Sequence, residues 1–321
     1  MSMGWCSARL LRAVLFSMAL GCGAAWATDA AGAPPDPAVA TPVFGPAPAP
    51  PRPSAYPPVR WSPEWTRVSL AEVMISATMT LRADDLGAAL EGPEEATIDF
   101  EVPILDNGGR DLLRASSPGR RNGAARLSDL GFRTLVFAPY VLDVGLGALV
   151  LQRNPDVAAQ LALIDFEVLT LAGFTQLVGT RVIGRARPYV TDCPPEGCSG
   201  GPYRSLLSGH AMASFTAAGL ICVHHKFLPL FGGGGADQVA CVWALSVASL
   251  TGALRVVADE HWASDVLLGS GLGWLLGYYL PQLLHFHAKK VVAAQHGSSI
   301  RWMPTLTGTS ERGTLGVLGT F

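Results

Sequence analysis

Charged residues are scarce in this sequence. Asp, Glu, Lys and Arg make up 15% of the 321 residues, whereas hydrophobic residues make up 49%. Typical soluble domains carry about 25% charged residues. The shortage indicates a membrane protein or a helical bundle with a large buried core. The net charge of -2 shows no basic excess, so no nucleic-acid partner is expected.

The N-terminus has the pattern of an export signal. Arg9 and Arg12 precede an apolar stretch at 13–20, and Ala25-Trp26-Ala27 supplies the small residues of a cleavage site. A first transmembrane anchor is the alternative, but roughly 8 to 12 apolar residues are short for a span. We therefore expect residues 1–27 to be removed and the protein to reach the periplasmic side of the cell envelope.

Cleavage after Ala27 would leave four cysteines. An even number of cysteines in an exported chain suggests two disulfides. The local pairing would be Cys193–Cys198 and Cys222–Cys241. Buried free thiols are the alternative for the second pair. If Cys222 and Cys241 are paired near the end of the bundle away from the site, an exported, soluble or peripheral bundle is favoured over one that spans the membrane.

Composition divides the remainder of the chain into four parts. Pro and Ala dominate the first, which is expected to be a disordered linker. The second part is expected to contain a helix at 67–83 and a surface loop at 84–126. The last part lacks a helical period, so it is expected to be a tail or hairpin. The parts are the linker at 28–66, the N-terminal helix and loop region at 67–126, the helical-bundle domain at 127–292, and the C-terminal tail at 293–321.

Long apolar segments separated by Gly, Pro and charged residues predict an all-α bundle of about five to six long helices. Four of these segments have 17 to 20 residues, which is near the length of a membrane span. The sixth helix would be 67–83. The five others are expected at 134–152, 161–180, 211–223, 238–254 and 266–284.

Polar residues inside these segments need partners. Asp143, Asp165 and Glu167 lie in the two earliest segments, where we expect them to pair with arginines or to line a polar face. His224 and His225 are expected at the surface. The last segment carries a Gly at every fourth position, 269, 273 and 277, which allows another helix to approach closely.

Antiparallel helices would bring the loops at 181–209 and 255–264 to the same end of the bundle, where the active site is expected. The first loop contains "RVIGRARPY", with Arg181, Arg185 and Arg187, and "SLLSGHA", with Ser208, Gly209 and His210 at a helix start. Guanidinium groups and free N–H groups at a helix N-terminus both bind phosphate. We therefore expect a phosphate site formed by these residues and Arg255.

The second loop, "LRVVADEHWASD", supplies a nucleophile and its partner. His261 and Asp265 are four residues apart, so on a helix they share a face and the carboxylate can hold the imidazole in one tautomer. His261 would then attack phosphorus, and His210 would protonate the leaving oxygen. Arginines supply the positive charge, so no metal is expected.

These three segments resemble the type 2 phosphatidic acid phosphatase and vanadium haloperoxidase superfamily, whose motifs are K-x6-R-P, P-S-G-H and S-R-x5-H-x3-D. The resemblance covers about residues 127–285. It implies His261 as the nucleophile that forms a phosphohistidine, Asp265 as its orienting group and His210 as the acid and base. It also implies Arg187, Ser208 and Arg255 as phosphate ligands.

The resemblance implies a metal-independent phosphatase acting on a lipid phosphate, an isoprenyl pyrophosphate or a small phosphoester. Membrane association is expected, either integral or peripheral. The alternative is a vanadate-dependent haloperoxidase, in which the same residues hold vanadate as the cofactor. Vanadate would inhibit the phosphatase.

The sequence departs from the motifs at three positions. Thr180 stands in place of the lysine, Leu207 in place of the proline and Leu254 in place of the serine. A hydrogen bond to a charged group contributes roughly 1.5–3 kcal/mol, so losing the lysine should weaken activity without abolishing it. Arg181 or Arg185 is a candidate substitute.

Overall fold

The computed structural model describes most of the second of two units into which the chain divides, residues 53–321. The predicted signal peptide, the linker up to residue 58, and Cys198 lie outside the described residues, so the Cys193–Cys198 pairing stays a prediction. The described residues are 59–90, 92, 95–98, 102–193 and 200–286, with the backbone of 301–309 and 312–320.

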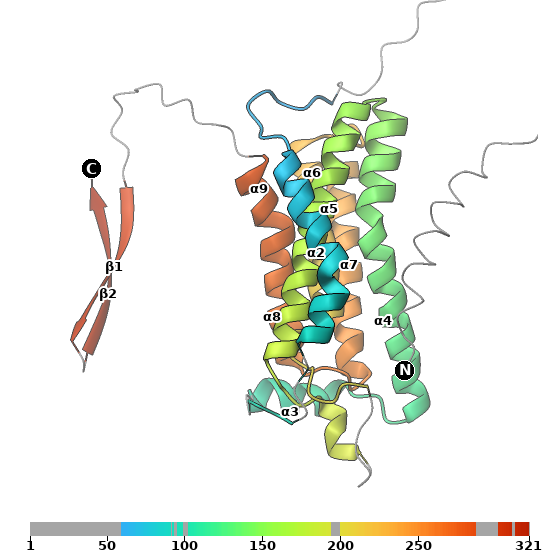
Figure 1. The fold of residues 1–321 in the computed structure, drawn as a ribbon, viewed down its shortest axis with the longest axis vertical. Helices are drawn as coiled ribbons and strands as arrows, with labels where there is room; N and C mark the ends of the chain where they lie inside the picture. The colour runs from blue at the N-terminus through green and yellow to red at the C-terminus, as the bar shows by residue number, and fades with distance from the viewer. Residues whose placement is uncertain are drawn as a thin grey trace, which may run out of the picture. The chain divides into compact units, whose positions relative to one another are not determined.

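The described part of the bundle consists of helices, as predicted (Figure 1). Two of the long helices include π-helical stretches, η1 and η3. In chain order the elements are α2 (Leu70–Ala89), α3 (Pro103–Leu113), α4 (Pro118–Ala138), η1 (Pro139–Leu151), α5 (Pro155–Val182), the short 3-10 helix η2 (Pro188–Asp192), α6 (Gly209–Phe227), α7 (Gly235–Val257), α8 (Ala263–Trp274), η3 (Leu275–Tyr279) and α9 (Leu280–Leu284).

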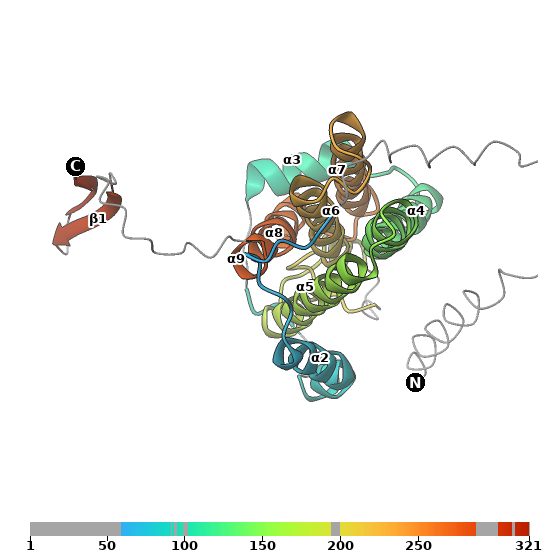
Figure 2. The same cartoon turned by 90° about the horizontal axis from the view of Figure 1, so that it is seen from above.

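Helix α6 lies at the centre of the bundle. It packs against α4, α5, α7 and α8, and the view along the bundle shows these helices around it (Figure 2). Helix α2 lies outside this ring and packs against α5. Near the C-terminus, β1 (Arg301–Thr309) and β2 (Arg312–Thr320) form an antiparallel hairpin in which Arg301 pairs with Thr320.

The glycine face of the last helix is confirmed as a close helix contact. A Cβ on Gly269 would lie 2.8 Å from the carbonyl oxygen of Ser208. On Gly273 and Gly277 it would collide with the backbone carbonyls of Met212 and Thr216. These three carbonyl groups lie at the start of α6 or on its first two turns. The glycines therefore let α8 and η3 pack directly against the backbone of the central helix.

The linker boundary at residue 66 is wrong. Val59 and Trp61 are buried in the core. The ring centroid of Trp61 lies 5.6 Å from that of Phe286, and Trp65 packs edge-on against the same ring at 5.2 Å. The described segment that follows the Pro-rich stretch therefore has enough aromatic surface to close the end of the bundle.

The predicted surface loop at 84–126 is also wrong in part. It contains α3 and the first turns of α4, each of which begins with a proline at its first turn, Pro103 and Pro118. Ser117 caps α4 by accepting a hydrogen bond from the backbone N–H of Arg120. These helices were not predicted because the region is polar and lacks the hydrophobic periodicity that indicates a helix.

The buried acidic residues pair with histidines instead of arginines. Asp143 accepts hydrogen bonds from His224 Nδ1 at 2.8 Å and His225 Nε2 at 3.2 Å, and His225 Nδ1 also contacts Asp237 at 2.5 Å. Asp165 lies 3.7 Å from His224 Nε2. The predicted surface position of His224 and His225 is therefore wrong, because these rings satisfy carboxylates inside the bundle.

Three helical stretches of the described residues are long and apolar enough to cross a membrane: Pro118–Leu151, Pro155–Val182 and Gly235–Val257. Large apolar side chains such as Val141 and Val242 are exposed on their flanks. The Cys222–Cys241 disulfide that joins α6 to α7 is confirmed. Its interpretation as the sign of a wholly exported bundle stays a prediction.

Replacing Gly273 with Ala should lower the melting temperature, because the new Cβ meets the Met212 backbone, which cannot move aside. Overpacking of this kind costs about 1–3 kcal/mol. Gly271→Ala in the same helix is the matched control, since nothing lies within 4 Å of its Cβ. Thermal unfolding in detergent measures both, and equal melting temperatures would contradict the close contact.

Candidate active site

The predicted site residues gather around one cavity of about 450 Å³. It lies at the end of the bundle where α5 and α7 end and α6 begins, the lower end in Figure 1. Six of the nine predicted residues line this cavity: Arg181, Arg187, Gly209, His210, Arg255 and His261. The other three, Arg185, Ser208 and Asp265, lie behind its wall.

His261 is held by a backbone carbonyl. Its Nδ1 lies 2.8 Å from the oxygen of Ser205, which can only accept, so Nδ1 carries the proton and Nε2 keeps its lone pair. Burial, Arg187 and Arg255 lower the pKa of His261 well below its usual value. The imidazole in the free site is therefore neutral, the state required of a nucleophile.

Asp265 acts on His261 through Ser205. The carboxylate lies 4.0 Å from Nδ1 of His261, beyond hydrogen-bonding distance. It accepts instead from the Ser205 hydroxyl at 2.5 Å and from the backbone N–H of Trp262 at 3.0 Å. The direct His261–Asp265 contact expected from the spacing is thus replaced by an indirect one, and sequence reasoning missed Ser205, since no motif spacing marks a carbonyl.

Arg185 is a structural cation, so its prediction as a phosphate ligand is wrong. Its side chain is 3% exposed and forms ion pairs with Asp106, at 2.8 Å, and with Asp265. It also donates to the hydroxyl of Ser264 at 2.7 Å. This guanidinium faces carboxylates behind the cavity wall because α3, which the sequence did not reveal, supplies Asp106.

Arg187 and Arg255 share one carboxylate in the free site. Glu260 Oε2 forms an ion pair with Arg187 Nη1 and lies 3.4 Å from Arg255 Nη2. The Nε atoms of both arginines are buried and have no hydrogen-bond partner among the residues that the structure describes. The two side chains therefore have N–H groups that could donate to an anion. The carboxylate of Glu260 neutralises part of their positive charge.

Arg181 also lines the cavity, but its guanidinium is partly committed elsewhere. Nη1 donates to the backbone carbonyls of Gly87 and Leu90 at the end of α2, the second at 2.9 Å. This contact satisfies the last carbonyls of α2 and fastens the helix to α5. Arg181 is therefore a weaker candidate than the sequence suggested for replacing the motif lysine whose position Thr180 occupies.

His210 is oriented by an acidic residue of α4. Its Nε2 lies 2.8 Å from Asp129 Oδ1, and its ring packs 4.9 Å from that of Phe132. Burial and the nearby Arg255 lower the pKa of His210 to about 4, against the opposing effect of Asp129. Nδ1 has no partner in the described part of the chain, so this nitrogen is left to exchange a proton with a ligand.

The start of α6 forms the floor of the cavity. Ser208 is the N-cap residue, and its buried hydroxyl has no partner among the described residues. A Cβ on Gly209 would lie 3.1 Å from the side chain of Gln176, so a larger residue would crowd the cavity wall. The free N–H groups and positive end of α6 suit an anion here.

Comparisons with known proteins agree with this geometry. Residues 162–289 match the model of the PAP2 superfamily. This part of the chain is therefore similar to the PAP2 superfamily. The match begins in α5 and takes in every predicted site residue.

Two similar proteins are lipid phosphatases by name. The chain is 32% identical over 119 residues to the lipid A 1-phosphatase of Porphyromonas gingivalis, a match that covers 36% of this chain and 23% of that protein. The chain therefore spans less than a quarter of that relative's length. The crystal structure of a transmembrane PAP2 type phosphatidylglycerolphosphate phosphatase from Bacillus subtilis is 22% identical, with a TM-score of 0.42, over 65% of this chain and 94% of the other.

The cavity contains a cation that sequence reasoning missed. Arg204 lines it together with Thr180, the residue at the lysine position. The Arg204 guanidinium has no hydrogen-bond or ion-pair partner among the residues that the structure describes. Burial and the charges of Arg181 and Arg187 lower the pKa of Arg204, as expected of a cation packed among cations with no anion present.

Asp129→Asn should move the alkaline limb of the kcat pH profile to lower pH by about 1 pH unit. The carboxylate opposes the lowering of the His210 pKa, so its removal lets burial and Arg255 lower the pKa further. His210 would then lose its catalytic proton earlier as the pH rises. A pH series of initial phosphate-release rates measures the shift.

Asp111→Asn on α3 is the control, because it removes the same charge from an exposed position that does not contact His210. An unchanged alkaline limb in Asp129→Asn would show that Asp129 does not tune His210.

Proposed function

We propose that this protein is a membrane-embedded PAP2-type phosphatase that releases phosphate from a lipid phosphate through a phosphohistidine on His261. The single observation that carries the proposal is the state of His261. Its Nδ1 is committed to Ser205, and its remaining nitrogen belongs to a neutral ring in a cavity with Arg187, Arg204 and Arg255.

The reaction would proceed in two balanced steps. Nε2 of His261 forms a bond to phosphorus while the bond to the leaving oxygen breaks, and His210 gives that oxygen a proton. A water oxygen then forms a bond to phosphorus while the bond between phosphorus and Nε2 of His261 breaks, His210 takes a proton from the water, and inorganic phosphate leaves. The arginines stabilise the charge on the equatorial oxygens in both transition states.

A bound phosphate dianion would prepare His210 for the first step. In the free site, Arg255 and burial keep the pKa of this ring at about 4, so it is neutral at pH 7. Two negative charges between Arg187 and Arg255 would cancel the positive field and raise the pKa of His210. The acid would thus become protonated when a substrate is bound.

Three features support a lipid as the substrate. Three helices are long and apolar enough for a membrane, and their flanks expose large apolar side chains. The cavity lies at the end of these helices, where a lipid headgroup would stand. The similar protein from P. gingivalis is named a lipid A 1-phosphatase.

Phosphate release from a panel of lipid phosphates, isoprenyl pyrophosphates and small phosphoesters tests the proposal. We expect the lipid substrates to be the best, His261→Ala to abolish release, and vanadate to inhibit by occupying the phosphate site. Protein quenched in alkaline detergent should contain a labelled phosphohistidine, stable to alkali and labile to acid, in the wild type but not in His261→Ala. Halide oxidation that requires vanadate, without phosphate release, would contradict the phosphatase.

Arg204→Ala should lower kcat/KM about 10- to 100-fold. The guanidinium would replace the positive charge that Thr180 lacks, and such a contact contributes roughly 1.5–3 kcal/mol. Adding Thr180→Lys to this variant should restore part of the loss, because the lysine returns a cation to the same cavity. Steady-state kinetics measures both variants.

Arg120→Ala, at an exposed position near the start of α4, is the matched control and should leave kcat/KM unchanged. A wild-type rate in Arg204→Ala would show that the cavity does not use this cation.

A further inference from the structure

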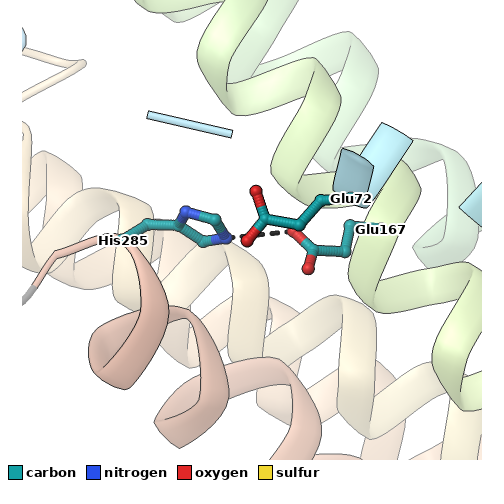
Figure 3. A group of neighbouring side chains, drawn as sticks. All are labelled: Glu72, Glu167 and His285. Carbon is teal, nitrogen blue, oxygen red and sulfur yellow. Dashed lines mark hydrogen bonds and ion pairs between the residues drawn. The ribbon is translucent and has the colours of Figure 1, made fainter. Parts of the chain in front are cut away.

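A second cluster of ionisable side chains lies away from the cavity. Glu72 of α2, Glu167 of α5 and His285 at the end of α9 point toward one another (Figure 3). One oxygen or nitrogen atom from each lies within 4.8 Å of the other two. Glu167 and Thr180 are thirteen residues apart on α5, so about 20 Å separates this cluster from the phosphate site.

The surroundings of His285 leave room for a cation in this cluster. Its Nδ1 lies 3.3 Å from the backbone carbonyl of Thr66, which can only accept a hydrogen bond. Its Nε2 lies 3.0 Å from Glu167 Oε2. Both neighbours are acceptors, and a neutral ring has only one N–H to donate, so a second proton or a metal ion would satisfy the nitrogen that is left.

The charge balance favours a metal ion over a proton. Two carboxylates and one imidazole meet here, and no arginine or lysine forms an ion pair with either glutamate in the described part of the chain. One added proton would leave a net negative charge at a site where His285 is fully buried. A divalent cation would neutralise both carboxylates.

The three ligands are already held in place. The carbonyl of Thr66 fixes the His285 ring, in the manner of the outer partners that orient metal-binding histidines. Glu72 accepts a hydrogen bond from the Ser69 backbone N–H at 2.5 Å as part of a capping box. Little side-chain freedom would therefore be lost when a metal binds.

We propose that Glu72, Glu167 and His285 bind one divalent transition metal ion of the zinc type. An imidazole with two carboxylates suits zinc, manganese or iron better than magnesium or calcium, which prefer oxygen ligands alone. The ion would fasten the outer helix α2 and the end of α9 to α5. Arg181 already fastens the opposite end of α2 to the same helix.

Metal titration of the purified full-length chain in detergent tests this site. The protein is stripped with a chelator and titrated with Zn²⁺ while the melting temperature is followed. We expect one equivalent to raise the melting temperature by several degrees. Glu167→Gln and His285→Gln should weaken Zn²⁺ binding by at least about 10-fold, whereas Glu64→Gln, at an exposed position on the preceding segment, should not.

Co²⁺ titration of the wild type gives a second measurement that does not depend on whether a variant folds. A visible absorption band that saturates at one equivalent, and that Zn²⁺ displaces, is expected. No Zn²⁺-dependent change in melting temperature together with no Co²⁺ band would overturn the proposal and leave a proton between His285 and Glu167. Neither measurement uses phosphatase activity, so this site and the proposed reaction can fail separately.

Discussion

The buried guanidinium of Arg185 joins the segments on which the active site depends. It binds Asp106 of α3 at 2.8 Å, the carboxylate of Asp265 on α8, and the hydroxyl of Ser264. Asp106 also accepts from the Ser264 backbone N–H at 2.8 Å. Removing one partner from a buried pair of this kind costs about 3–5 kcal/mol, because the remaining charge is left without water. Such a network has only one low-energy arrangement, which fixes the start of α8 relative to the loop before α6.

The position of His261 follows from that network. Asp265 receives the hydroxyl of Ser205, and the carbonyl of the same serine receives Nδ1 of His261. The loop segment that contains Ser205 is thus held on both sides. The close approach at Gly269 places the Ser208 carbonyl against α8. The start of α6 and His261 are therefore aligned by backbone contacts, which vary less than contacts between long side chains.

Spacing within the sequence predicted the bundle, the shared end of its loops and the glycine contact, because each depends on residues of one helix or on helix order. It did not predict Ser205, Asp129 or Arg204. Each of these acts through a contact between distant segments, and its role depends on the path of a loop or the rotation of a helix. The same limit explains why Arg185 was expected to bind phosphate and why the contact of Glu167 with His285 was not predicted.

The charges of the free site bear on which anions it can accept. Arg187 and Arg255 lie against Glu260, and Arg255 is also 3.7 Å from Asp129. An anion must therefore offset the interactions that these carboxylates already make. A monoanion would only replace the single negative charge of one carboxylate, so the attraction to the arginines would change little. A phosphate dianion would bring a second negative charge, and it could also accept hydrogen bonds from the guanidinium of Arg204, which has no partner among the described residues. Under the proposed function, this balance would favour phosphate monoesters over diesters, because a diester carries a single negative charge.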